Sequence, residues 1–119
     1  MLDTETLQKL RLNAFENVNN GFFIADENGI FVDMNQAYAD IYGYCKDEMI
    51  GRHMSMVVDE THREAEDAEY KKRMLGTGHA SVFTAKRIRK DKSAIYTSSR
   101  CCPFIYCGAK YMVYTVSDI

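Results

Sequence analysis

The sequence lacks the features of fibrous, disordered and membrane-spanning proteins. It contains no tryptophan and one proline, Pro103, in 119 residues, and 27% of its residues are charged. Its apolar residues occur in short groups such as 21–25 and 111–114, well short of the roughly 20 that a transmembrane helix needs. The charged residues 1–12 do not resemble a signal peptide. We therefore expect one globular domain in the cytoplasm, with no membrane contact by this segment.

An excess of charge of one sign is also missing. The formal net charge is −2, which gives no reason to expect a nucleic acid or an anionic lipid as partner. The densest basic stretch, 86–90, has no interleaved aromatic residues that could stack on bases. Charges on a hairpin also block pairing with other strand edges. We expect no nucleic-acid partner.

Motifs for catalysis and metal binding are absent as well. There is no glycine-rich phosphate loop and no G-x-S-x-G sequence, and the acidic run 64–69 fits a solvated helix face. The cysteines form no C-x-x-C pair, and no histidine lies at zinc-site spacing from them. We expect no catalysis, no metal and four free thiols. The cysteines are Cys45, Cys101, Cys102 and Cys107.

The N-terminal segment predicts an amphipathic helix from Asp3 to Asn19. Asp3 is a suitable N-cap, and apolar residues recur on one side at helical spacing. A single helix ahead of a domain has to bury such a stripe on the domain or on a second copy of itself. We expect a homodimer formed through this helix, residues 1–19, and a separate domain over 20–119. The stripe consists of Leu7, Leu10, Ala14 and Val18.

A β-hairpin and short helices are predicted next. Aromatic and β-branched residues at 21–25 and 30–34 flank a turn that ends in Asn28 and Gly29. Asn35 is a suitable cap for a helix that ends before Gly43. Residues 46–50 predict one further helical turn.

A longer helix and three strands complete the predicted domain. Thr61 is expected to cap the helix, which runs to Leu75, because Glu64 follows at the spacing of a capping box. Long strands joined by short turns predict an antiparallel meander. The fold class is therefore α+β, a five-stranded antiparallel sheet with helices on one face and an N-terminal flanking helix. The last strands are predicted at 80–89, 94–106 and 110–117.

Several motifs in this sequence resemble those of the PAS domain, or sensory box, of bacterial-type signalling proteins. They occur in the same order along the chain as in that family. Lys90 and Asp91 resemble the family's K-D-G turn, with Lys92 where the family has glycine. Pro103 matches the proline that ends the fourth strand, and residues 117–119 resemble the D-I-T ending. The resemblance spans roughly residues 10–119. The central motif comprises Asn35, Ala37, Tyr38, Ile41, Gly43, Tyr44, Glu48, Ile50 and Gly51.

The resemblance implies flavin, haem, a small acid or no ligand. Met54 stands where the light-sensing flavin subclass has its adduct-forming cysteine. A thioether cannot attack flavin, so covalent flavin photochemistry is excluded, while non-covalent flavin stays open. Oxygen-sensing haem members place a histidine mid-helix, where this chain has Glu66 and Asp67, so haem is not expected. His53 is the histidine nearest to the expected pocket. The cofactor is unknown: a small organic ligand or none.

Aligning Pro103 with the family's proline predicts a pocket on the concave side of the sheet. Small, partly polar residues alternate there at 95–101, where a core strand usually has large aliphatic ones. The prediction is a wet or ligand-filled cavity; the other interpretation is that tyrosines and methionines fill the space. The pocket candidates are Met54, Met56, Ile95, Thr97, Ser99, Cys101, Met112 and Tyr114.

Three functions follow from this pattern. The first is a sensory and dimerisation module that binds a small ligand or a partner in its core. Its resemblance to the family implies that Asp118 relays the state of the core to a covalently linked output domain of histidine kinase or diguanylate cyclase type. The second is a redox sensor based on Cys101, Cys102 or Cys107. The third is an interaction module with a filled core and no ligand.

Overall fold

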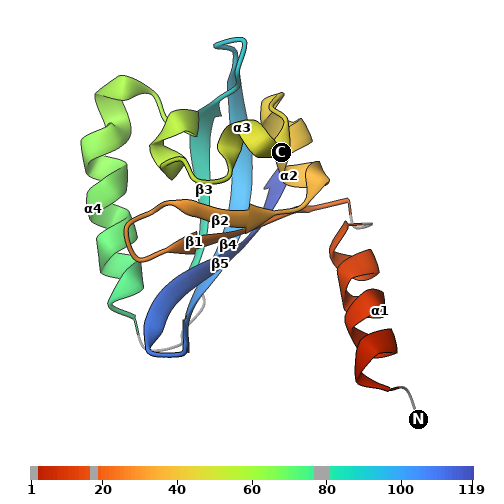
Figure 1. Ribbon diagram of the computed structural model, residues 1–119. Coiled ribbons are helices and arrows are strands. Elements are labelled where there is room, and N and C mark those ends of the chain that lie inside the picture. The colour runs from red at the N-terminus through yellow and green to blue at the C-terminus, as the bar shows by residue number, and fades with distance from the viewer. Residues whose placement is uncertain (1–2, 17–18, 77–80) are drawn as a thin grey trace.

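A five-stranded antiparallel sheet forms the centre of the protein, and helices cover one of its faces (Figure 1). The computed structural model describes residues 3–16, 19–76 and 81–119. The helices are α1 (Thr4–Glu16), α2 (Gln36–Tyr42), α3 (Lys46–Met49), η1 (Met54–Val57), η2 (Glu60–His62) and α4 (Arg63–Met74). The strands are β1 (Gly21–Asp26), β2 (Phe31–Met34), β3 (Ser81–Ile88), β4 (Ala94–Tyr106) and β5 (Ala109–Asp118).

The strand order is β2-β1-β5-β4-β3, so the last strand lies in the middle of the sheet. β5 pairs antiparallel with β1 on one side and with β4 on the other. Tyr114 is thereby placed between Phe23 of β1 and Cys101 of β4. The predicted hairpin, meander and fold class are confirmed.

Burial alternates along the strands because only one face of the sheet is covered. Ile95, Thr97, Ser99 and Cys101 of β4 are all buried, whereas the residues between them are exposed or half-buried. Buried and half-buried residues also alternate along β5 over 112–117. The inward face predicted for these two strands is therefore confirmed.

Asn35 joins three parts of the fold through four hydrogen bonds of its side chain. Its Oδ1 accepts from the backbone N–H groups of Tyr38 (3.0 Å) and Phe22 (2.9 Å). Its Nδ2 donates to the carbonyls of Phe15 (2.9 Å) and Asn20 (3.1 Å). The predicted cap of α2 is confirmed, and the same fully buried side chain fixes the end of α1 to β1.

Helix α1 projects away from the sheet (Figure 1). Asp3 caps it, as predicted, by accepting from the N–H of Thr6 at 2.7 Å. Leu7 is half-buried, and Leu10 and Ala14 are exposed; none of the described residues of the helix is buried. Val18, the last member of the predicted stripe, lies outside the described residues. The described part of the stripe therefore has little contact with the domain.

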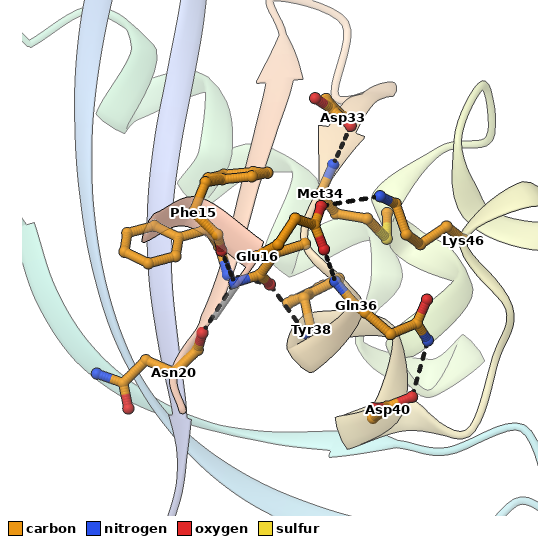
Figure 2. Close-up of polar contacts among 11 residues, drawn as sticks. Phe15, Glu16, Asn20, Asp33, Met34, Gln36, Tyr38, Asp40 and Lys46 are labelled. Atoms are coloured by element: carbon orange, nitrogen blue, oxygen red, sulfur yellow. Dashed lines mark hydrogen bonds and ion pairs between the residues drawn. The ribbon is translucent and has the colours of Figure 1, made fainter. Parts of the chain in front are cut away.

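The C-terminal end of α1 is held by polar contacts. Glu16 accepts from Lys46 Nζ at 3.1 Å and from the backbone N–H of Gln36 at 3.3 Å (Figure 2). The ring of Phe15 packs at 5.6 Å from that of Phe22 on the outer side of β1. These contacts place α1 beside the start of the sheet and leave its other turns free of it.

The prediction that Thr61 caps α4 is wrong. Helix α4 begins at Arg63 and is preceded by the 3₁₀ turn η2. The carboxylate of Asp59 accepts from the N–H of Thr61 at 3.2 Å, so the capping interaction occurs two residues earlier. The start of the helix is consequently displaced, and no capping box forms between Thr61 and Glu64.

Candidate functional site

A cavity lies between the concave face of the sheet and the segment that runs from η1 through α4. The volume that the centre of a water molecule can occupy in this cavity is about 40 Å³. That is room for about three water molecules. Its walls are largely apolar side chains from four different elements and the segment after η1. These are Phe23, Val57, Val58, Phe83 and Val116.

Three of the predicted pocket residues line this cavity: Met54, Ser99 and Tyr114. The others pack elsewhere in the core. Met56 is half-buried and packs against the hydrophobic core, and the remaining four are buried away from the cavity, namely Ile95, Thr97, Cys101 and Met112. The structure therefore brings together part of the predicted set, and a ligand-binding role for these residues stays a prediction.

Tyrosines of α2 occupy much of the space that the small residues of β4 leave. The hydroxyls of Tyr38, Tyr42 and Thr97 lie next to one another. Burial raises the pKa of both tyrosines, so the hydroxyls stay protonated. Tyr42 therefore lies against Thr97, whereas Ser99 faces the cavity.

An ion pair that the sequence did not reveal forms one side of the cavity. Arg87 of β3 is buried and donates to Glu66 of α4 at 3.1 Å. The acidic run 64–69 was expected on a solvated face, but Glu66 and Asp67 both line the cavity. Strand periodicity contains the signal for Arg87, because it shares the inward face of β3 with Phe83.

His53 lines the cavity at the end nearest η1, as expected for the histidine closest to the pocket. Its Nδ1 accepts from the N–H of Ser55 at 3.0 Å, and its Nε2 lies 3.9 Å from Asp67 Oδ1. Asp67 also pairs with Lys71 at 3.0 Å. Over the described part of the chain, no three His, Cys, Asp or Glu side chains gather as a metal site.

Tyr114 has a buried polar group that no described part of the protein satisfies. Its ring stacks on Phe23 at 4.2 Å, and its hydroxyl has no hydrogen-bond partner. The neighbouring Tyr70 differs, because its hydroxyl donates to the carbonyl of Asp26 at 2.5 Å. Burial raises the pKa of Tyr114 and of Tyr70, so both groups are neutral hydrogen-bond donors at physiological pH.

The four cysteines are in the thiol form and not joined in disulfides. Cys101 is buried, and burial raises the pKa of its thiol, which lowers its reactivity because the thiolate is the nucleophile. Cys45 and Cys107 are exposed. Cys107 occupies the tip of the β4–β5 hairpin, away from the cavity.

The predicted relay residue, Asp118, is exposed at the end of β5. It pairs in register with Thr97 of β4, whose hydroxyl contacts Tyr42. Among the described residues, no helix has the length and apolar character needed to cross a membrane.

Comparisons with known proteins agree with this architecture. The PAS fold family matches residues 9–119. A PAS domain from Colwellia psychrerythraea superposes with a TM-score of 0.84 at 23% identity, over 95% of this chain and 97% of that one. The PAS domain of an HTR-like protein from Haloarcula marismortui gives 0.76 at 20% identity, over 96% and 99%.

A third similar structure is a domain of a sensory box sensor histidine kinase/response regulator from Geobacter sulfurreducens. Its TM-score is 0.77 at 16% identity, over 98% of this chain and 97% of that one. At these identities the structures share the fold alone, and the family match extends from within α1 to the last residue. The chain belongs to the PAS family, whose members are typically sensory modules of signal transduction.

Proposed function

We propose that this domain is a ligand-binding sensor that reports the occupancy of its cavity to a linked output domain. The observation that carries the proposal is the cavity between β4, β5 and α4, which contains a buried hydroxyl without a partner. A core built only for stability satisfies its buried polar groups, whereas a binding site needs unsatisfied ones to receive a ligand. The cavity volume favours a small molecule over flavin or haem.

The output domain is proposed to be a histidine kinase or a diguanylate cyclase. The Geobacter sulfurreducens neighbour, a domain of a sensor histidine kinase/response regulator, supports the first of these. In this proposal residues 20–119 form the sensory domain in the cytoplasm, and Asp118 passes the state of the sheet to the output domain.

Helix α1, with residues 1–19, is proposed to form a homodimer. Leu10 is 51% exposed and Leu12 63% exposed, which leaves apolar area for a second copy to cover. A lone helix of this length is marginal in water, so packing between two copies would also account for its order.

The two alternative functions have less support. The redox sensor based on Cys101, Cys102 or Cys107 needs a reactive thiol that senses the core. Cys101 has a raised pKa and little exposure, and the exposed Cys107 lies at a hairpin tip away from the cavity. The interaction module with a filled core needs complete packing, and the space in front of Ser99 argues against it.

A screen by nuclear magnetic resonance tests the ligand-binding proposal. Small neutral, acidic and basic metabolites are added to the ¹⁵N-labelled protein, and amide shifts are followed. The expected result is a saturable response at cavity residues such as Ser99, Tyr70 and Val116. Responses confined to the outer sheet face, or no response to any compound, would contradict it.

A further inference from the structure

We infer that the cavity takes a short-chain monocarboxylate whose carboxylate binds between the Tyr114 hydroxyl and the Arg73 guanidinium. The inference rests on the proposed small-ligand function and specifies the chemistry of its ligand. It follows from a buried hydroxyl that has no partner among the described residues, from the charge pairing around the cavity, and from the cavity's size.

The Tyr114 hydroxyl has no hydrogen-bond acceptor among the described protein groups. The residue is 2% exposed, so water outside the protein does not solvate it. The Arg73 guanidinium and the Cys101 thiol are near enough to affect its charge state, but neither makes a hydrogen bond of acceptable geometry with it. A ligand oxygen in the cavity would remove the cost of this buried, unsatisfied group.

Arg73 supplies the positive charge beside this hydroxyl. Its guanidinium lies over the ring of Phe83, 3.8 Å from the centroid, and the Phe83 ring meets Tyr114 edge-on at 6.5 Å. All three residues line the cavity. Stacking on Phe83 holds the planar guanidinium of Arg73 in place and leaves its N–H groups available to bind an anion.

The other charged side chains that line the cavity already form ion pairs or hydrogen bonds. The carboxylate of Glu66 is paired with Arg87, and that of Asp67 with Lys71. Arg63 donates through Nε to the carbonyl of Val58 at the other end of α4. Within the described residues Arg73 has no carboxylate partner, so the cavity has an unmatched positive charge next to Tyr114.

A carboxylate fits this pair of donors better than a phosphate. One of its two oxygens can accept from Tyr114 while the other accepts from Arg73. A phosphate dianion would bring more charge and more oxygens than one cation and one hydroxyl can satisfy. The apolar walls accommodate a tail of a few carbons, and about 40 Å³ excludes a long one.

The test compares propionate with propionamide, which has nearly the same shape and no charge. Both are titrated into the ¹⁵N-labelled protein, with butyrate and hexanoate added to probe tail length. We expect propionate to bind at least tenfold more tightly than propionamide. We also expect hexanoate to bind more weakly than propionate.

Three variants locate the carboxylate. Arg73→Gln should weaken propionate binding at least tenfold and leave propionamide binding unchanged. Tyr114→Phe should weaken propionate binding severalfold while leaving the melting temperature equal or higher, because the hydroxyl has no partner to lose. Arg100→Gln, an exposed arginine on the opposite side of β4, is the matched control and should leave binding unchanged.

The outcomes separate this inference from the function on which it rests. Equal binding of propionate and propionamide, or full propionate binding by Arg73→Gln, would overturn the carboxylate assignment and leave a ligand-binding cavity. A neutral or basic compound as the best ligand of the metabolite screen would do the same. Failure of every compound to reach the cavity residues would overturn both.

Discussion

Lys92 has the backbone conformation that its position in the β3–β4 turn requires, at an energetic cost. Its φ is +74°, in the left-handed region where a residue with a Cβ is disfavoured by roughly 1 kcal/mol or more. The turn forms nonetheless, because the Asp91 carboxylate accepts from the N–H of Ser93 at 2.9 Å. The K-D-G turn of the PAS family has glycine at this position. The replacement of that glycine by Lys92 therefore corresponds to strain in the structure.

Replacing Lys92 with glycine should therefore stabilise the protein. We expect Lys92→Gly to raise the free energy of unfolding by about 0.5–1 kcal/mol, since relief of strain exceeds the added chain entropy. Urea denaturation measures the change. Lys86→Gly, on the exposed side of β3, is the control and should destabilise; a loss of stability in Lys92→Gly as well would show that the turn is not strained.

Single residues also show where sequence-based prediction succeeds and where it ends. Asn35 and Asp3 were correctly predicted as caps, because capping depends on neighbours three residues away. The Thr61 prediction was wrong because Asp59 caps the 3₁₀ turn η2, which comes first and shifts the start of α4 to Arg63. Arg73 and Arg87 were missed, since their roles depend on Phe83 and Glu66, which meet them only after the helix packs on the sheet.

At the scale of elements, α3 and the β3–β4 turn are joined by Glu48. Its carboxylate accepts from the N–H of Cys45 at 2.9 Å and from Lys90 Nζ at 2.6 Å. The hydrogen bond from Cys45, followed by the contact with Lys90, lowers the pKa of Glu48. A carboxylate with a lowered pKa in the folded state stabilises the protein above its unfolded pKa, about 4.3, and loses this contribution as the pH falls through the folded value.

We predict that Glu48→Gln reduces stability at pH 7 and that its difference from the wild type disappears on acidification below about pH 4. Thermal unfolding measured from pH 3 to pH 8 follows both proteins. Glu27→Gln, at an exposed turn position, is the matched carboxylate control. Its stability should differ from that of the wild type by the same amount at every pH. A Glu48→Gln deficit that persists at pH 3 would contradict the link to ionisation.

Helix α1 is the element whose partner is still a prediction. Removing residues 1–18 should convert the proposed dimer into a monomer, because the exposed stripe is then lost. Light scattering coupled to size-exclusion chromatography gives the mass. Leu10→Glu is a smaller change that should also yield a monomer. Gln8→Glu, on the exposed surface of α1, is the control and should stay dimeric. If the protein without residues 1–18 stays dimeric, the interface lies elsewhere.

At the scale of the whole molecule, the order of elements and the antiparallel topology were predictable from hydrophobic periodicity and turn residues. The inward faces of β4 and β5 were also predictable, because strand alternation is strict. The cavity was predictable only in part. Small residues on β4 indicated missing volume, but the positions of Tyr38 and Tyr42, which decide how much of it stays open, depend on how α2 packs.

The proposed signal leaves the molecule at the end of β5. Asp118 pairs in register with Thr97, which contacts Tyr42, so a change in the core can reach it through one strand pair. In the full-length protein we expect Asp118→Ala to change output activity severalfold without altering ligand affinity of this domain. Ser117→Ala, the neighbouring change, should have little effect; equal output from Asp118→Ala and the parent would refute the relay.

The ligand-binding function depends on whether the space in front of Ser99 is open or filled. Ser99→Val adds volume to this space, and Ser98→Val makes the same change on the opposite side of β4, which controls for strand propensity. The decisive measurement is the free energy of unfolding of these two variants in urea, without added ligand. An open cavity predicts that Ser99→Val is at least as stable as Ser98→Val, whereas a loss of about 1–3 kcal/mol relative to it, as expected for overpacking, would show a filled core and contradict the ligand-binding function.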